Sequence, residues 1–512
     1  MSEWNSGYVT DIGYTHGYYQ ELNPVRLRLA FLNQGILFPE ITAACELGFG
    51  QGVSINMHAA ASFTQWHGTD FNPSQAAFAR ELGASANSNI NLRDDDFAKF
   101  AAREDLPEFD FIALHGIWSW INNENRKIIA DFIEKKLKVG GVLYISYNTL
   151  PGWSSFAPAR HLLSLSAQVN GSPSDGVLGR VEKSLDFTEQ LISSNSGYAR
   201  ANATVLDRLK KVRGQNKNYV AHEYFNRDWE PMYFSTMADW LQSSKVQYAC
   251  SANYLEHVDL LNLTPEQQRL LGGISDVPLR ETARDFIVNQ QFRRDYWVKG
   301  LRRLSVLEQV EMLRTQRVVL VTHRPDVKLL VTGILGEAKM SEEKYNPFLD
   351  LLADHKPRSI GQIERDLSAQ GVNFPQILQC VLILISAGNI EPVQADDAQV
   401  SKYRKQTDKL NSHILQKSRG NADLACLASP LTGGGIAVGR FAQLFLISIL
   451  QGKKLPAEWA QAAWELLRTQ GQKLVKAEKT LETPEENLAE LTSQATVFAQ
   501  KQLPILRSLM VI

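Results

Sequence analysis

Residues 41–52 read Ile-Thr-Ala-Ala-Cys-Glu-Leu-Gly-Phe-Gly-Gln-Gly, an apolar segment that runs into an acidic residue and three alternating glycines. Glu46 stands two places before Gly48, and the other glycines are Gly50 and Gly52. Glycine lets the backbone turn sharply and approach a ligand closely, so the pattern predicts a strand that passes into a helix beside a nucleoside cofactor. The simpler interpretation is a tight turn with an acidic residue on the surface.

Two further acidic positions follow strand-like runs. Asp70 comes directly after Thr64–Thr69, and Asp94–Asp96 follow Ile90–Arg93. Ligands of open α/β sheets bind at the carboxyl ends of the strands, where we expect all of these acids to lie. Asp70 can accept hydrogen bonds from both ribose hydroxyls, and a carboxylate of the triplet can accept one from an adenine amino group beside Phe97. A solvated run of charges is the alternative for the triplet.

Strand-like apolar runs alternate with helix-like segments from about residue 38 to residue 165. The expected strands are Ile41–Leu47, Thr64–Thr69, Ile90–Arg93, Phe109–His115 and Val142–Tyr147. The expected helices are Val53–Ala61, Pro73–Leu82 (ending at Gly83) and Asn122–Leu137. This alternation predicts an α/β domain with a doubly wound, Rossmann-like parallel sheet.

The length and composition exclude several classes of protein. A chain of 512 residues predicts two to four domains, and a formal net charge of −1 does not suit a dedicated nucleic-acid binder. The four cysteines are far apart, which disfavours disulfides and structural zinc. The amino terminus lacks signal-peptide features, and no apolar stretch is long enough for a membrane span. We therefore expect a cytoplasmic protein.

The chemistry of the glycine turn distinguishes two cofactors. The turn lacks the Gly-x-Gly-x-x-Gly spacing that brings the backbone to a pyrophosphate, and Glu46 would repel that anion. An acidic residue is favourable beside a cationic sulfonium group. S-adenosyl-L-methionine therefore fits the site better than NAD does.

The chain also resembles the class I S-adenosylmethionine-dependent methyltransferases, and more narrowly the bacterial group that carries a methyltransferase regulatory domain. The motifs that carry the resemblance are Tyr14–Leu27, Glu46–Gly52, Gly68–Pro73, His115–Trp120, Ser146–Trp153, Ala221–Tyr224 and Phe292-Arg293. They cover roughly residues 14 to 300, and the carboxyl-terminal part matches more loosely. Some members of this group methylate lysines of bacterial surface proteins, so the resemblance implies a protein lysine as acceptor.

The domain organisation follows from turn signals and the resemblance. We expect a methyltransferase domain at 1–169, a helical linker region at 170–215, an α+β regulatory domain at 216–303 and a mainly helical accessory region at 304–512. Within the last, residues 341–395 predict a winged-helix-like segment for packing or protein binding. The basic and aromatic run Phe292–Lys299 favours a helix face or an interdomain contact over a nucleic-acid surface.

The resemblance and the strand-end positions together give the candidate site residues. The candidate cofactor residues are Tyr14, Tyr18, Glu46, Gly48, Gly50, Gly52, Asp70, Phe71, Asn72, Asp95, Asp96, Phe97, His115 and Gly116. The candidate catalytic residues are His115, Trp118, Tyr147 and Asn148, and Trp120 and Trp153 are expected beside them in an aromatic mouth. No metal site is expected, because His222-Glu223 has no partner at the spacing a metal needs.

A lysine acceptor sets requirements on that mouth. The lysine amine must lose its proton, and burial among apolar and aromatic groups lowers its pKa from about 10.4. No Asn/Asp-Pro-Pro-aromatic motif follows the fourth strand, which argues against methylation of DNA adenine or glutamine amides. Two alternatives stay open: a small-molecule acceptor, and a non-catalytic regulatory protein that binds S-adenosylmethionine. The accessory domains are expected to shape a substrate groove, shield the site or form a homodimer.

Overall fold

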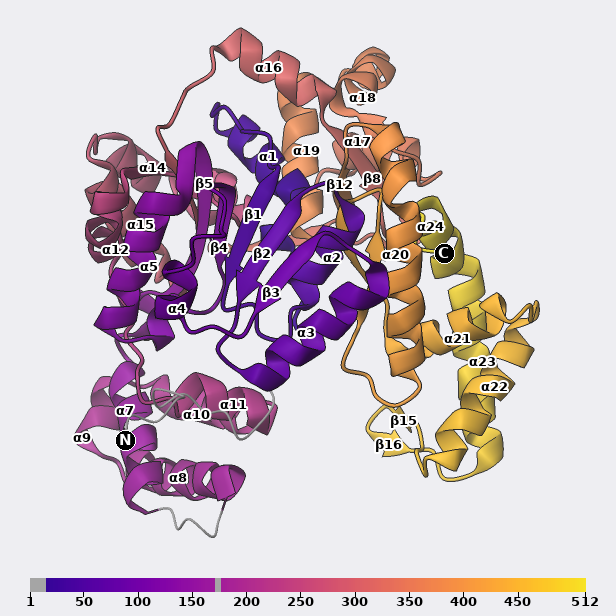
Figure 1. Ribbon diagram of the computed structural model, residues 1–512, viewed down its shortest axis with the longest axis horizontal. Helices are drawn as coiled ribbons and strands as arrows, with labels where there is room; N and C mark the ends of the chain where they lie inside the picture. Colours follow the sequence, from indigo (N-terminus) through magenta and orange to yellow (C-terminus); the bar gives the residue numbers. More distant parts are fainter. Residues whose placement is uncertain (1–14, 171–175) are drawn as a thin grey trace.

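The computed structural model describes residues 15–170 and 176–512, and a seven-stranded sheet lies at its centre (Figure 1). The strand order is β3-β2-β1-β4-β5-β7-β6. The strands are β1 (Ala43–Leu47), β2 (Gln65–Thr69), β3 (Ile90–Arg93), β4 (Phe109–Leu114), β5 (Leu137–Asn148), β6 (Val246–Ser251) and β7 (Phe292–Lys299). The first five are parallel, and β7 runs antiparallel between β5 and β6. The predicted doubly wound α/β fold is confirmed.

Helices cover both faces of this sheet because successive strand residues point to opposite sides. Ala44 belongs to a buried cluster with residues of α1 (Pro24–Asn33), α2 (Val53–Ala61) and α3 (Pro73–Ala86). Its neighbour Cys45 belongs to a different cluster, with residues of α4 (Phe97–Ala101), α5 (Asn123–Lys136) and α12 (Phe234–Leu241). The carboxyl ends of the parallel strands therefore lie at one edge, between two helical layers.

Helix α3 differs from its predicted extent. The sequence predicted its end at Gly83, but the helix continues to Ala86 and ends at Asn87, whose φ is 54°. Gly83 instead serves packing, since a Cβ there would lie 2.8 Å from the Ile90 Cγ2 atom. The glycine signal thus marked a close helix–strand contact and not a terminus.

Residues 216–303 extend the same sheet. Strand β7 pairs with β5 from Asn148↔Phe292 to Val142↔Val298. The expectation that Phe292–Lys299 forms a helix face is wrong, because its side chains alternate between the two sides of a strand. The helices of this part are α11 (Lys217–Tyr224), α12, α13 (Asp259–Asn262), α14 (Pro265–Gly272) and α15 (Val277–Val288).

A helical arm with a hydrophobic cluster of its own lies between β5 and β6 in the sequence. Figure 1 shows it below the sheet, in magenta and purple. Its helices are α6 (Leu150–Trp153), α7 (Ala157–Val169), α8 (Gly176–Ser193), α9 (Gly197–Ala201) and α10 (Val205–Arg213). Helix α11 packs against it.

Residues 317–393 of the carboxyl-terminal region contain three α-helices and a small antiparallel sheet, and the winged-helix-like segment expected at 341–395 stays a prediction. These helices are α17 (Glu342–Leu351), α18 (Ile360–Leu367) and α19 (Phe374–Ser386), and the sheet joins β8 (Arg317–Leu320), β11 (Arg358–Ser359) and β12 (Ile390–Val393). Helix α16 (Val306–Thr315) precedes them, and the hairpin β9 (Leu330–Gly333)–β10 (Gly336–Lys339) lies before α17.

The last part of the chain packs back onto the central domain. Helix α20 (Asp397–Ser418) contacts α2 and α3, and the hairpin β13 (Cys426–Ser429)–β14 (Gly434–Ala437) contacts α2. The remaining elements are α21 (Arg440–Leu450), α22 (Pro456–Thr469), β15 (Val475–Lys476), β16 (Lys479–Thr480), α23 (Pro484–Val497) and α24 (Leu503–Ser508). In the part of the chain that the structure describes, no helix combines the length and apolarity needed to cross a bilayer.

Candidate active site

A cavity of about 320 Å³ opens at the carboxyl ends of the parallel strands, and we call it the strand-end cavity. Residues that follow four different strands line it together. Those expected from the sequence are Gly48, Gly50, Asp70, Phe71, Asp95, Asp96, Phe97, His115 and Gly116, with Trp120 beside them. The structure therefore collects in one place the glycine turn, the acids after β2 and β3, and the residues after β4.

The three glycines of the turn have different roles. Gly48, Gly50 and Gly52 all adopt positive φ angles, of 76°, 57° and 68°. A Cβ on Gly48 would lie 2.4 Å from the side chain of Ile117, another lining residue, whereas one on Gly52 would lie 2.4 Å from the Ala79 Cβ on α3. Gly52 is not on the cavity wall; it lets α2 begin close against α3.

Asp70 is held by backbone N–H groups at the cavity wall. Its Oδ2 atom accepts from the Gly50 N–H at 2.8 Å, and its Oδ1 atom accepts from the Asn72 N–H at 3.0 Å. Burial raises the pKa of Asp70 to about 6, and the two N–H donors oppose that rise. Asn72 does not line the cavity; its side chain caps α3 by accepting from the Ser74 N–H at 3.0 Å.

Glu46 lies at the end of β1, behind the cavity wall and almost fully buried. Burial, and secondarily the charge of Asp70, raises the pKa of Glu46 well above its ordinary value. Its Oε2 atom has no hydrogen-bond partner within the described residues. The buried carboxyl group thus has one oxygen that is not used by the protein around it.

His115 and Tyr19 form a stacked pair on another side of the cavity. Their ring centroids are 3.7 Å apart with an angle of 24° between the planes. His115 Nδ1 lies 2.7 Å from the Tyr144 hydroxyl, and burial lowers the pKa of His115 to about 4. The imidazole is therefore neutral near pH 7. Sequence reasoning missed Tyr19, although the tyrosine pair at positions 18 and 19 was its signal.

Tyr18, predicted to fold over the cofactor, lies elsewhere. Its ring packs against the β13–β14 hairpin, where a Cβ on Gly435 would lie 3.1–3.2 Å from it, and its centroid is 5.5 Å from that of His58. The prediction for Tyr18 needs correction because the carboxyl-terminal hairpin occupies the space to which this side chain points. Tyr14, the other tyrosine predicted to fold over the cofactor, lies outside the described residues.

Trp118, Tyr147 and Asn148 do not line the strand-end cavity either. The aromatic mouth therefore contains fewer of the expected residues than the sequence predicted. Trp118 is fully buried, with its indole N–H directed at the Met232 sulfur at 3.3 Å. The Tyr147 hydroxyl donates to Asp295 Oδ2 at 2.9 Å, and Asn148 is buried. Tyr147 falls on the strand face turned toward α12, opposite Tyr144, because strand side chains alternate.

Trp153, also expected at the mouth, packs within the helical arm. Its ring centroid lies 4.9 Å from that of Trp229, and its indole N–H donates to the Gln291 carbonyl oxygen at 3.0 Å. Trp120 is the aromatic residue of the predicted mouth that does line the cavity, together with His115.

Two segments of the cavity wall were not predicted. They are the start of α5 and the loop after α11, which contribute Asn122, Glu124, Asn125, Ile128, Asn226 and Asp228. Arg126 of α5 connects these two segments. It is buried, pairs with Glu230, and donates to the Trp118 carbonyl oxygen at 3.2 Å. The Glu230 N–H donates to the Ser119 carbonyl oxygen at 2.8 Å. The loop after α11 is therefore fixed to the segment after β4.

The charge of the cavity wall has one sign. Five carboxylates line it, and neither lysine nor arginine occurs among its described lining residues. These carboxylates belong to Asp70, Asp95, Asp96, Glu124 and Asp228. Such a wall favours a cationic ligand and disfavours a pyrophosphate. No group of three or more His, Cys, Asp or Glu suited to a metal ion occurs in residues 15–170 and 176–512.

Comparisons with known proteins show which sequences and structures this chain is similar to. Residues 216–299 match the family model described as a predicted methyltransferase regulatory domain. An uncharacterized Synechocystis protein, sll1526, is 40% identical over 99% of both chains. An uncharacterized Rickettsia prowazekii protein, RP789, is 28% identical over 54% of this chain and 49% of its own.

A solved structure shares the whole architecture. PKMT2 from Rickettsia typhi in complex with AdoHcy superposes with a TM-score of 0.70, covering 97% of this chain and 99% of that one at 17% identity. A second structure of PKMT2 from Rickettsia typhi superposes with a TM-score of 0.68. At this identity the likeness shows that the two chains share a fold.

Proposed function

Because this chain belongs to the class I S-adenosylmethionine-dependent methyltransferases that carry a methyltransferase regulatory domain, we propose that it methylates lysine side chains of protein substrates. Its cofactor is S-adenosyl-L-methionine. The observation that carries the proposal is the strand-end cavity, with five carboxylates, no lysine or arginine on its described wall, and a glycine turn at its base.

The residues that line the strand-end cavity fit the cofactor. The Asp70 carboxylate, already oriented by the Gly50 and Asn72 N–H groups, is placed to accept from ribose hydroxyls. Asp95, which pairs with Arg103, or Asp96, which pairs with Lys99, would accept from an adenine amino group, with Phe97 against the base. A nicotinamide dinucleotide would bring a pyrophosphate to the same acidic wall, at an electrostatic cost.

The bound cofactor supplies an electrophilic methyl group on a sulfonium, so the protein needs to align the acceptor and exclude water. Tyr19, His115 and Trp120 provide a ring-lined wall for that purpose. His115 is neutral near pH 7 and adds no positive charge that would repel an amine or a sulfonium. Burial against such rings lowers the pKa of a lysine amine, which favours the nucleophilic neutral form.

Two features support a protein lysine over a small metabolite. Glu124 and Asp228 place carboxylates on the part of the wall formed by α5 and the loop after α11, where they attract a cationic side chain. The PKMT2 fold extends over nearly the whole chain, including the helical arm and the carboxyl-terminal region. We expect these accessory regions to shape a groove for a protein substrate.

The test uses S-adenosylmethionine labelled on its methyl group, bacterial lysate and the purified full-length protein. We expect label in protein bands, and methylated lysine after complete hydrolysis. Asp70→Ala should abolish labelling, whereas Asp94→Ala should not, because Asp94 pairs with Arg80 and does not line the cavity. Label confined to small molecules would overturn the lysine acceptor. Tight cofactor binding with no labelled acceptor would instead support a regulatory binding protein.

A further inference from the structure

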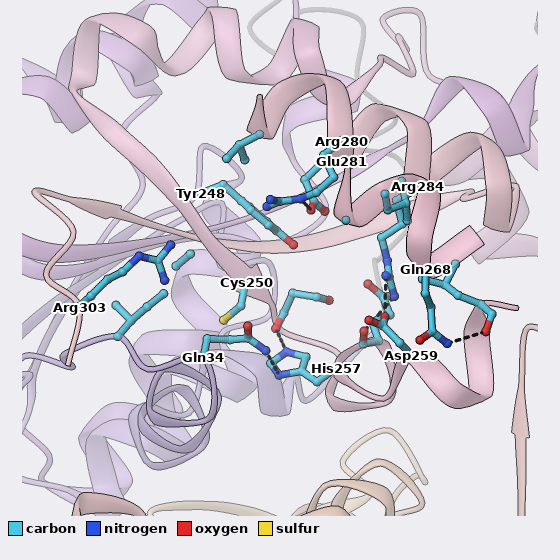
Figure 2. Close-up of a pocket in the computed structure, with 18 residues that line it drawn as sticks. Gln34, Tyr248, Cys250, His257, Asp259, Gln268, Arg280, Glu281, Arg284 and Arg303 are labelled. Carbon is cyan, nitrogen blue, oxygen red and sulfur yellow. Dashed lines mark hydrogen bonds and ion pairs between the residues drawn. The ribbon is translucent and has the colours of Figure 1, made fainter. Parts of the chain in front are cut away.

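A second cavity, of about 380 Å³, lies beside the edge strand β6, and we call it the β6 cavity. It shares no lining residue with the strand-end cavity. Three parts of the chain enclose it: the end of α1 with residues 34–36, the region 248–284, and Arg303 in the connection to α16 (Figure 2). Pre-formed cavities at junctions of this kind are preferred sites for small ligands.

The carboxylates of the β6 cavity already have partners. Asp259 accepts a hydrogen bond from Arg284 at 2.9 Å, and Glu281 accepts one from the buried Arg293 at 2.8 Å. Glu256 accepts from two neighbouring amide side chains at 3.2 and 3.3 Å. All three carboxylates are therefore hydrogen-bonded inside the protein, two of them to arginines.

Two arginines of the cavity are not compensated in the same way. Arg303 makes no side-chain hydrogen bond or ion pair with any residue that the structure describes. Arg280 approaches Glu281 at 3.5 Å, but the other oxygen of that carboxylate is engaged by Arg293. Figure 2 shows the Tyr248 side chain between Arg303, at the left, and Arg280, which lies beside Glu281. The lining carries three arginines and three carboxylates, so an anion would depend on the guanidinium donors of Arg280 and Arg303 that these neighbours leave unused.

His257 forms a fixed, uncharged part of the wall. Its Nε2 atom lies 2.7 Å from the Ser251 carbonyl oxygen and donates to it, so Nδ1 is the acceptor for the amide groups of Asn33 and Gln34, at 3.0 and 3.2 Å. Burial lowers the pKa of His257, which agrees with the neutral form. The imidazole thus connects the end of α1 to β6 and holds the cavity open without competing for an anion.

We propose that the β6 cavity binds a small organic anion, whose carboxylate or phosphate group pairs with Arg280 and Arg303. The guanidinium groups supply planar donors that match both headgroups. An apolar body of the ligand packs against Ile36, Leu271 and Val277, which also line the cavity. Most of the lining falls within residues 216–299, so the site belongs to the part that matches the regulatory-domain model.

Titration calorimetry of the full-length protein tests this site with benzoate and phenyl phosphate, which share an apolar ring and differ in headgroup. Saturable binding of at least one anion is expected, with no binding of neutral benzyl alcohol, and the tighter anion identifies the headgroup. Arg303→Gln and Arg280→Gln should each weaken binding tenfold or more. The matched control is Arg302→Gln, because Arg302 is exposed and outside the cavity lining.

Two results would overturn the proposal. One is the absence of saturable binding for both anions, and the other is an equal loss of affinity in Arg302→Gln. Saturating S-adenosylmethionine should leave the anion affinity unchanged, because the two cavities share no residue; direct competition would place the anion in the strand-end cavity instead. The readout is binding alone, so the result does not depend on the proposed methyl transfer.

Discussion

Tyr19 stacks on His115 with 3.7 Å between the ring centroids, and this contact joins the segment before α1 to the end of β4. Tyr19 is anchored independently, since its N–H donates to the Ser54 hydroxyl at 2.7 Å. The stack therefore positions one wall of the strand-end cavity from two elements that are almost 100 residues apart in sequence.

Replacing Tyr19 by alanine should weaken S-adenosylmethionine binding about three- to tenfold. An aromatic contact of this kind contributes about 0.5–1.5 kcal/mol beyond its buried area, and about 1.4 kcal/mol is a factor of ten in affinity. Tyr19→Phe keeps the ring and should retain most of the affinity. Calorimetric titration measures both variants, and an alanine variant with the affinity of the wild type would remove Tyr19 from the site.

Asp70 should give cofactor binding a pH dependence. Its pKa is about 6 in the unliganded protein, so the carboxylate becomes protonated below pH 6 and loses acceptor capacity for ribose hydroxyls. The dissociation constant of the cofactor should rise as the pH falls from 7 to 5. In Asp70→Asn the affinity should be weak and nearly independent of pH over this range. A wild-type affinity that stays constant from pH 7 to 5 would contradict this role.

The raised pKa of Asp70 also predicts how the free energy of unfolding depends on pH. The pKa is raised from 3.8 to about 6 on folding, so the folded state holds this proton more tightly than the unfolded state. Between pH 4 and 6, raising the pH should therefore reduce the free energy of unfolding, by about 3 kcal/mol from this group. Denaturant unfolding at several pH values should show a smaller decrease in Asp70→Asn than in the wild type. Equal slopes would show that Asp70 titrates normally.

His115 should have the opposite effect. Its pKa falls from 6.5 to about 4 on folding, because burial disfavours the charged imidazole. This group therefore stabilises the fold fully above pH 6.5, and that contribution is lost as the pH falls toward 4. His115→Gln should flatten the decline between pH 6.5 and 4 in the same unfolding experiment. A variant with the unchanged wild-type profile would place the proton uptake on another group.

The sequence predicted those parts of the site whose position depends on local structure. The glycine turn, Asp70 and His115 each follow a strand, and parallel strands bring their carboxyl ends to one edge of a sheet. No long-range information is needed for that inference. The same reasoning gave the α/β alternation of residues 38–165.

The sequence did not reveal side-chain directions that depend on distant partners. Tyr147 turns toward Asp295 because β7 pairs beside β5, and this pairing joins residues almost 150 positions apart. Asn226 and Asp228 reach the cavity only because Arg126 and Glu230 fix their loop to α5. The predicted position of Tyr18 was wrong for the same reason, since the hairpin against which its ring packs begins more than 400 residues later.

Gly434 in that hairpin gives the last prediction. A Cβ at this position would lie 2.3 Å from the Tyr18 hydroxyl oxygen and 2.8 Å from the Asn23 Nδ2 atom. Both residues flank the segment that carries Tyr19, and Asn23 donates from this Nδ2 atom to the Thr432 carbonyl oxygen at 3.0 Å. Even a methyl group must therefore displace the Tyr18 and Asn23 side chains, which flank the segment that forms one wall of the strand-end cavity.

Gly434→Ala should thus destabilise the protein by about 1–3 kcal/mol, the usual cost of overpacking a tight contact, and should also weaken cofactor binding. Gly439→Ala is the matched control, since a Cβ there meets no atom within 4 Å. Thermal unfolding and calorimetric titration measure the two effects separately. If Gly434→Ala lowers stability but leaves the cofactor affinity equal to that of Gly439→Ala, the hairpin supports the fold without positioning the cavity wall. A loss of affinity in the variant that still folds at the temperature of measurement shows that the carboxyl-terminal region helps to hold the site in shape.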